Sequence, residues 1–167
     1  VKSGQMVAIV GPTGAGKTTI INLLMRFYDV LDGAIEVDGV NIKNMKREDL
    51  REIFGMVLQD TWLFNGTIYE NLEYGRFGAS KADIVEAAKV ANVHHFIKTM
   101  TDGYDMKLNE EASNISQGEK QLLTIARAVL KDPAILILDE ATSSIDTRLE
   151  ILIQTAMRNI MKGRTSF

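Results

Sequence analysis

The chain has 167 residues, of which 46% are hydrophobic and 25% charged, and its net charge is −3. This length allows one domain with its own hydrophobic core. The weakly acidic balance, without a strongly basic stretch, argues against nucleic-acid binding by charge alone, so we expect no nucleic-acid partner. The absence of cysteine excludes a disulfide framework and thiolate metal ligands. The sequence shows neither a signal peptide nor an apolar run of the about 18 residues that span a bilayer.

The first motif along the chain is a phosphate-binding loop. Residues 11–18 follow the pattern G-x-x-x-x-G-K-S/T. The apolar run Met6–Val10 before it predicts a buried parallel strand, and the stretch Thr19–Tyr28 after it predicts a helix. This strand–loop–helix context favours a nucleotide-phosphate site over a glycine-rich turn with a solvated lysine.

The residue types of this loop have a chemical reason. Glycines let the backbone come close to a ligand, so that successive N–H groups form an anion-binding nest at the positive end of a helix. Lys17 is positioned to neutralise the β- and γ-phosphates, and Thr18 offers a hydroxyl to Mg²⁺. The nucleotide-binding set that we predict consists of Gly11, Pro12, Thr13, Gly14, Ala15, Gly16, Lys17, Thr18 and Thr19.

The next elements are short. Alternating apolar residues around Asp38-Gly39 predict a hairpin over 34–42. Residues 47–52 can form a short helix. The run Phe54–Leu58 predicts a second core strand, which ends at Gln59.

The second half of the chain is mainly helical. The pattern is helical from Thr67 to about Lys98, and within it Ser80 with Asp83 three residues later resembles a capping box. We further expect a polar loop over 101–113, a long helix over about 116–130, an apolar strand over 134–138 and a final helix over 147–161.

Polar residues follow two of the predicted strands. Ligands in parallel α/β sheets bind beyond the carboxyl ends of the strands, which places Asp139 and Glu140 beside the phosphate loop. Asp139 can hold Mg²⁺ through water, and Glu140 can orient and deprotonate an attacking water. The amide oxygen of Gln59 could ligate Mg²⁺ or that water, although an exposed polar residue is an equally ordinary reading.

One further segment makes the pattern specific. The sequence Ser116-Gln117-Gly118-Glu119, followed by Gln121-Leu-Leu-Thr-Ile-Ala-Arg-Ala128, resembles the signature segment of ABC ATPases. The order and spacing of the phosphate loop, Gln59, Asp139-Glu140 and the turn over 143–146 match the same family. The stretches 59–68 and 109–112 resemble its exporter branch.

This resemblance implies a fold and a domain plan. The fold is an α/β P-loop NTPase (RecA-like) with a parallel sheet core and a helical insert subdomain. The chain is then a single ABC ATPase domain over 1–167, truncated at both ends. Its nucleotide-binding core is formed by 1–60 and 131–167, and the helical subdomain with the signature helix by about 61–130.

The resemblance also implies an activity and partners. The cofactors are ATP and Mg²⁺, with Glu140, Gln59 and Lys17 in catalysis and Thr18, Gln59 and Asp139 at the metal. Two such domains pair head to tail around two ATP molecules, so that Ser116 and Gly118 contact the ATP bound to the partner. The partners are this second nucleotide-binding domain and the transmembrane domain of the same transporter, at the cytoplasmic face of the cell membrane.

The signature departs from the family pattern at two positions. Gln117 stands where a glycine is usual, and Glu119 stands where a glutamine is usual. A carboxylate near a γ-phosphate is repulsive, although Glu119 can instead form a capping box with Ser116. An altered signature beside an intact Glu140 resembles one half of a heterodimeric exporter.

Two alternatives to an exporter subunit remain. The first is a soluble ABC ATPase of the DNA-repair or translation type, against which the acidic charge and the stretch 59–68 argue. The second is a nucleotide-gated module that does not hydrolyse ATP, against which Lys17, Asp139 and Glu140 argue.

Overall fold

A short parallel sheet forms the centre of the fold. In the computed structural model the described residues are 1–58, 60–139 and 146–167. Strands β3 (Phe54–Val57), β6 (Ile135–Leu138) and β7 (Thr165–Ser166) lie in the order β3-β6-β7, all parallel. The β3–β6 ladder pairs Phe54 with Ile135 and Val57 with Leu138. The two strands predicted over 54–58 and 134–138 are therefore confirmed to within one residue at each end.

The strand predicted over Met6–Val10 is wrong. Only Met6 pairs, as an isolated parallel bridge to Ser166, and the N–H of Val7 donates to the Ser166 carbonyl at 2.8 Å. Met6 is 75% exposed and Val10 is 88% exposed. The physical reason is that β7, the strand beside this segment, spans only two residues and gives Ala8–Val10 no ladder to continue.

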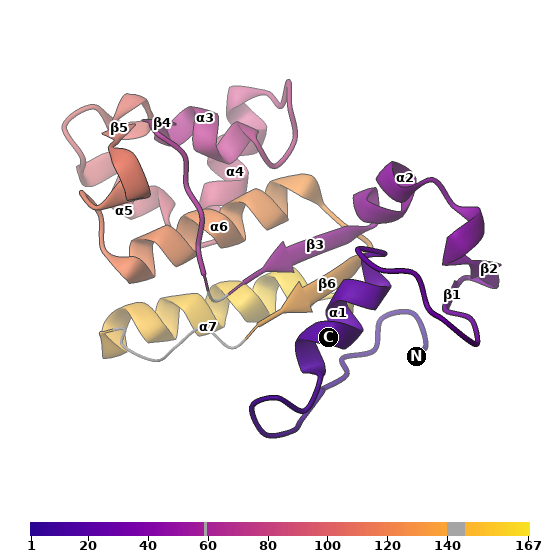
Figure 1. The fold of residues 1–167 in the computed structure, drawn as a ribbon. Coiled ribbons are helices and arrows are strands. Elements are labelled where there is room, and N and C mark those ends of the chain that lie inside the picture. The colour runs from indigo at the N-terminus through magenta and orange to yellow at the C-terminus, as the bar shows by residue number, and fades with distance from the viewer. Residues whose placement is uncertain (59, 140–145) are drawn as a thin grey trace.

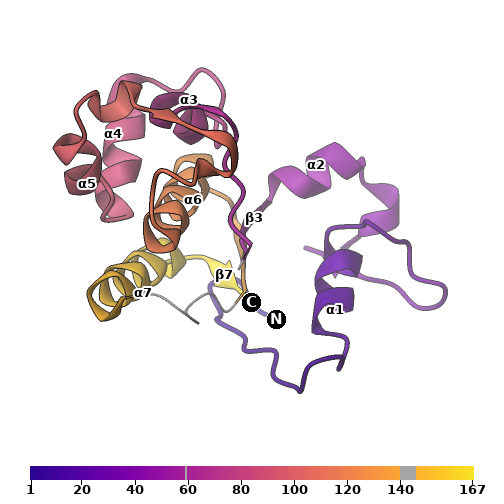
Figure 2. The same cartoon turned by 60° about the vertical axis from the view of Figure 1, so that its left-hand side comes forward.

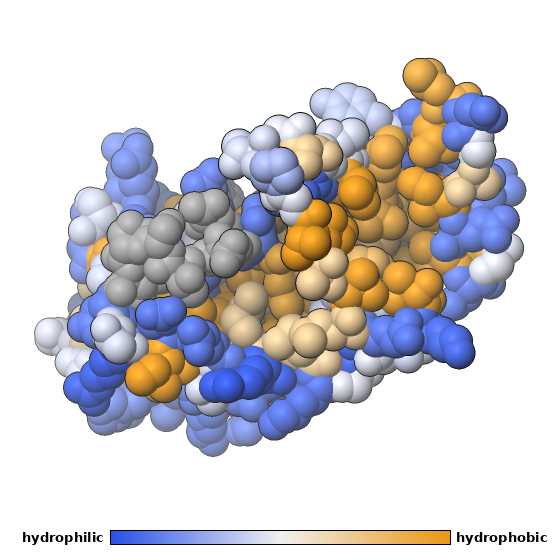
Figure 3. All heavy atoms as spheres, turned by 90° about the horizontal axis from the view of Figure 1, so that it is seen from below, coloured by the Kyte–Doolittle hydropathy of each residue, from blue (hydrophilic) through white to orange (hydrophobic). Residues whose placement is uncertain are grey.

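The face of the molecule seen from below shows a broad hydrophobic area (Figure 3).

The segment between the phosphate loop and β3 contains small elements. These are α1 (Lys17–Leu24), β1 (Glu36–Val37), β2 (Val40–Asn41), a 3₁₀ turn (Ile42–Asn44) and α2 (Arg47–Glu52). Asp38 and Gly39 have φ of 50° and 78°, as a type I′ hairpin turn requires, so the predicted hairpin is confirmed. The first helix ends at Leu24 rather than at Tyr28 because Arg26 takes a left-handed backbone and its guanidinium donates to the Ile42 and Met45 carbonyls.

Helices make up most of the second half. The elements are β4 (Gly66–Thr67), α3 (Ile68–Glu73), α4 (Lys81–Val90), α5 (His94–Thr99), a 3₁₀ turn (Gly103–Asp105), β5 (Lys107–Leu108), a second 3₁₀ turn (Glu110–Ala112), α6 (Gln117–Lys131) and α7 (Thr147–Met161). The capping box of Ser80 and Asp83 is confirmed. The loop predicted over 101–113 contains β5, which pairs with β4 and buries Leu108 completely. None of the described helices is long and apolar enough to cross a membrane.

Two hydrophobic cores lie on opposite faces of the sheet. Successive residues of a strand point to opposite faces, so Leu136 joins the larger core and Ile137 the smaller one. The larger core is shared with α3, α4, α6 and α7, and the smaller with α1 and α2 (Figure 1). Figure 2 shows these two groups of helices on either side of β3.

We predict that Gly55→Ala destabilises the fold. A Cβ at Gly55 in β3 would lie 2.4 Å from Pro133 Cγ, and the proline ring cannot rotate away. The free energy of unfolding should fall by about 2 kcal/mol, measured by urea titration with circular dichroism. At Gly78 a Cβ would meet no atom within 4 Å. Gly78→Ala should therefore lose only about 1 kcal/mol for its left-handed backbone, and an equal loss in both variants would contradict the close approach of β3 and Pro133.

Candidate nucleotide-binding site

The backbone of the phosphate loop turns at two glycines. Gly14 and Gly16 have φ of 83° and 90°, in the left-handed region. The N–H of Ala15 donates to the Pro12 carbonyl at 3.1 Å, which closes the turn. Gly16 is the N-cap of α1 and supplies no capping side chain. The first N–H groups of α1 therefore receive no capping hydrogen bond from the N-cap residue, at the positive end of the helix, where an anion is stabilised.

The Lys17 side chain folds back onto the carbonyl groups of the phosphate loop. The Lys17 ammonium donates to the Gly11 carbonyl at 2.7 Å and to the Pro12 carbonyl at 3.1 Å. Thr18 and Thr19 follow in the first turn of α1, and both are exposed. The loop and the first turn of α1 thus present the Lys17 ammonium, the Thr18 and Thr19 hydroxyls and backbone N–H groups together.

Asp139 lies at the carboxyl end of β6. Its backbone N–H donates to the Val57 carbonyl at 2.9 Å, so it stands level with the end of β3. The sheet continues from β6 to β7 and then to the bridge at Met6, all in parallel. The chain therefore leaves the sheet at Met6 and Val7 parallel to β6, toward the edge where Asp139 lies, and reaches the phosphate loop four residues after Val7. Gln59 and Glu140, the other residues predicted at this edge, lie outside the described residues.

The signature residues stand at the start of α6. Ser116 is the N-cap, and its Oγ accepts from the Glu119 N–H at 3.3 Å while the Glu119 carboxylate accepts from the Ser116 N–H at 2.7 Å. The capping box predicted from the sequence is confirmed. The Gln117 side chain donates to Thr61 Oγ1 at 3.1 Å, and Gly118 is buried. In Figures 1 and 2 the start of α6 lies apart from the phosphate loop, so the structure does not bring these two groups together in one chain.

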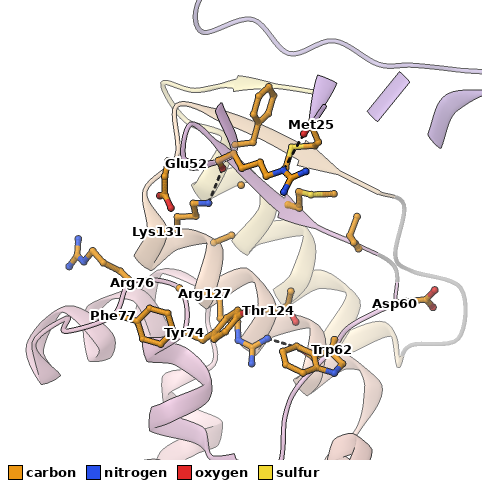
Figure 4. Close-up of a pocket in the computed structure, with 17 residues that line it drawn as sticks. Met25, Glu52, Asp60, Trp62, Tyr74, Arg76, Phe77, Thr124, Arg127 and Lys131 are labelled. Atoms are coloured by element: carbon orange, nitrogen blue, oxygen red, sulfur yellow. Dashed lines mark hydrogen bonds between the residues drawn. The ribbon is translucent and has the colours of Figure 1, made fainter. Parts of the chain in front are cut away.

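A groove between α2–β3 and the α3–α4 connection was not predicted. Its volume is about 740 Å³, and Figure 4 shows aromatic rings and basic side chains along it. Trp62, Tyr74 and Phe77 are 60%, 50% and 78% exposed. The lining residues come from four separate stretches, 25, 51–62, 74–77 and 124–131. Trp62, Tyr74 and Phe77 lie up to 15 residues apart in the sequence, and only the fold brings them to one surface.

Comparison with known proteins decides the family. A family model described as ABC transporter matches residues 1–143. The chain belongs to this family. The sequence-based identification is therefore confirmed, and so is the α/β fold class with its parallel sheet.

The relatives of this ABC domain are longer proteins. The chain is 58% identical over 164 residues to a fatty acid ABC transporter ATP-binding/permease protein of Mycobacterium bovis, covering 98% of the chain and 26% of that protein. It is 53% identical over 167 residues to a β-(1→2)glucan export ATP-binding/permease protein of Bartonella henselae, covering 100% of the chain and 28% of that protein. The chain thus spans between 26% and 28% of the length of these relatives.

A solved structure agrees with the fold of this ABC domain. It is a bacterial Atm1-family ABC exporter with ATP bound, with a TM-score of 0.91 and 48% sequence identity. The match covers 99% of the chain and 29% of that structure.

We predict that Gly16→Ala weakens MgATP binding. A Cβ at Gly16 would meet no atom within 4 Å, so the effect comes from the backbone, whose φ of 90° an alanine rarely adopts. Affinity measured by titration calorimetry should fall about tenfold. Gly33 has φ of 75° and equally open surroundings outside the loop. Gly33→Ala is the matched control, and an equal loss of affinity in both would contradict a site at this loop.

Proposed function

We propose that this chain binds and hydrolyses MgATP and so powers the export of a substrate across a membrane. The observation that carries the proposal is the phosphate loop, with Lys17 and Thr18 at the uncapped start of α1 and the preceding segment directed toward the sheet edge where Asp139 lies. The 48% identity to an exporter with ATP bound supports it. Exporters among the relatives favour this function over a soluble ABC ATPase.

The donor set fits a magnesium ion shared with phosphates. The Thr18 hydroxyl and the Asp139 carboxylate are oxygen donors, and Mg²⁺ is usually held by one or two protein ligands together with phosphates and water. No described part of the chain has three or more His, Asp or Glu side chains grouped to hold a metal ion. Mg²⁺ in this site would neutralise charge on the phosphates, with Gln59 as a further oxygen ligand.

Three side chains then have separate roles in ATP hydrolysis. Lys17 exchanges its carbonyl acceptors at Gly11 and Pro12 for phosphate oxygens, which accept stronger, charge-assisted hydrogen bonds. Glu140 accepts the proton of the attacking water, and Gln59 orients that water. Thr19 completes the nucleotide-binding set beside Thr18.

The second half of each site comes from a partner domain. We infer that the start of α6 contacts an ATP held by another nucleotide-binding domain, because it lies apart from this chain's own loop. The exposed Ser116 would make this contact directly, and the buried Gly118 would have to offer its backbone. The Glu119 carboxylate is already bound to the Ser116 N–H. Because this negative charge stands at the helix start, we propose that the partner is a different chain, with this signature closing the weaker of two sites.

The groove is the proposed contact with the transmembrane domain. Its exposed aromatic rings and the basic Arg51, Arg76 and Lys131 offer a surface for an amphipathic segment. The relatives carry ATP-binding and permease parts in one protein. The chain would then work at the cytoplasmic face of the cell membrane, as part of that transporter.

We predict that Glu140→Gln nearly abolishes turnover. Steady-state hydrolysis by the full transporter in lipid vesicles should fall about 100-fold or more, because the general base is lost, while MgATP still binds. Glu86→Gln, an exposed carboxylate on α4, is the control and should leave the rate unchanged. Near-normal turnover in Glu140→Gln would exclude Glu140 as the base of a working site.

We also predict that Phe77→Ser uncouples the domain from the membrane. Phe77 is 78% exposed, so its loss should leave folding and MgATP binding intact. Transport per ATP hydrolysed, measured in the same vesicles, should fall several-fold if the groove docks the transmembrane domain. Leu31→Ser, at a fully exposed position outside the groove, is the control. Equal transport in both variants would exclude docking at Phe77.

A further inference from the structure

Arg127 of α6 is a buried cation held by backbone and amide groups. It is only 8% exposed. Its Nε donates to the Asn71 carbonyl and its Nη1 to the Trp62 carbonyl, both at 2.5 Å, and its Nη2 donates to Asn71 Oδ1. One guanidinium therefore ties α6 to α3 and to the segment that leads from β3 into the helical part.

Aromatic rings take the place of a carboxylate around this charge. The guanidinium carbon lies 5.5 Å from the ring centre of Tyr74, 5.8 Å from that of Phe64 and 5.9 Å from that of Trp62. None of the ion pairs among the described residues involves Arg127. Burial lowers the pKa of Arg127 to about 10, so the group is still protonated at neutral pH. The rings and the oxygen acceptors together compensate for the loss of water.

Asn71 is the fixed partner in this cluster. It is fully buried, and its Oδ1 accepts from the Phe64 N–H at 3.1 Å as well as from Arg127. Its Nδ2 donates to the Phe64 and Thr67 carbonyls, each at 3.0 Å. Every hydrogen-bonding position of this amide is used, so its orientation is defined.

The end of α3 meets α6 at the same residue. A Cβ at Gly75 would lie 2.4 Å from the Arg127 carbonyl oxygen, so the two backbones touch. Figure 4 shows Tyr74 and Trp62 on either side of Arg127 in the groove. The aromatic wall of the groove is therefore attached to α6 by both backbone contact and hydrogen bonds.

The same helix carries the signature residues. Ser116 precedes Arg127 by 11 residues, about 17 Å along a helix. The helix also lines the groove with Thr124 and Lys131. A displacement of the groove wall is therefore transmitted to the signature residues only if the wall and α6 move together.

We propose that Arg127 is a positioning residue that, with Asn71, locks the aromatic wall of the groove to the signature helix. Docking at the groove and contact with ATP at the signature then act on one rigid body. This role rests on the proposed function, because it presumes a docked membrane domain and a site closed by α6.

The test is Arg127→Lys in the full transporter, reconstituted in vesicles of phosphatidylethanolamine and phosphatidylglycerol. Lysine keeps the charge but lacks the planar fork that reaches Trp62 and Asn71 together. We expect kcat for MgATP hydrolysis to fall about tenfold while KM for MgATP stays within about twofold, since the phosphate loop is untouched. Arg158→Lys on the exposed face of α7 is the matched control and should change neither.

Temperature and a second variant separate positioning from stability. If Arg127 only stabilised the fold, Arg127→Lys would regain wild-type kcat at temperatures where circular dichroism shows the variant fully folded. That result would overturn the proposal. Asn71→Ala should lower kcat in the same way, and the double variant should lose no more than the worse single variant. If the fold-losses in kcat of the two single variants multiplied in the double variant, Arg127 and Asn71 would act independently, and this would contradict the proposal.

The wild-type control separates this role from the proposed function. A wild-type transporter that hydrolyses no MgATP refutes the proposed function and with it the coupling. If the wild type is active and Arg127→Lys has the same kcat, only the role of Arg127 is refuted and the proposed function stands.

Discussion

The parallel pairing of β3 with β6 is the constraint on which the rest of the arrangement depends. The ladder runs from the Ile135 N–H, which donates to the Ile53 carbonyl at 2.9 Å, to the Asp139 N–H, which donates to the Val57 carbonyl at 2.9 Å. It places the end of β3 and the end of β6 at one edge, and β7 and the bridge at Met6 extend the sheet in parallel toward the segment that carries the phosphate loop. Because parallel strands need long crossovers, the chain between β3 and β6 is free to form the helical part, including α6 and the groove. Site and groove are thus consequences of the same sheet.

Local signals in the sequence predicted local structure well. The Asp38-Gly39 turn, the helix over 47–52 and the capping box at Ser80 each depend on a few neighbouring residues, and all three are present in the structure. The strand over Met6–Val10 was wrong because apolar pattern alone does not supply a hydrogen-bonding partner. The groove could not be predicted because Arg51, Tyr74 and Arg127 meet only in the folded chain.

In the candidate site, too, local features could be predicted from the sequence and contacts between distant residues could not. The phosphate loop is recognisable because its chemistry is confined to eight consecutive positions, 11–18, and the position of Asp139 follows from its strand. The hydrogen bonds of the Lys17 ammonium to the loop carbonyls are not encoded in any pattern. Arg127 is a charged residue on an amphipathic helix, where such residues are ordinarily solvated. Its burial depends on three rings contributed by residues 62–74, which no spacing along α6 reveals.

The two helix starts of this domain differ in a way that bears on the proposed pairing with a second nucleotide-binding domain. At α1 the N-cap is Gly16, which has no side chain to accept a hydrogen bond from the first turn. At α6 the N-cap Ser116 accepts from the Glu119 N–H, and the Glu119 carboxylate adds a negative charge at the positive end of the helix. An incoming phosphate would meet open donors at α1 but would compete with a carboxylate at α6. A copy of this chain would bring the same carboxylate to both shared sites, so pairing with itself would weaken both. A partner whose signature lacks this charge would leave one strong site, built on the phosphate loop of this chain.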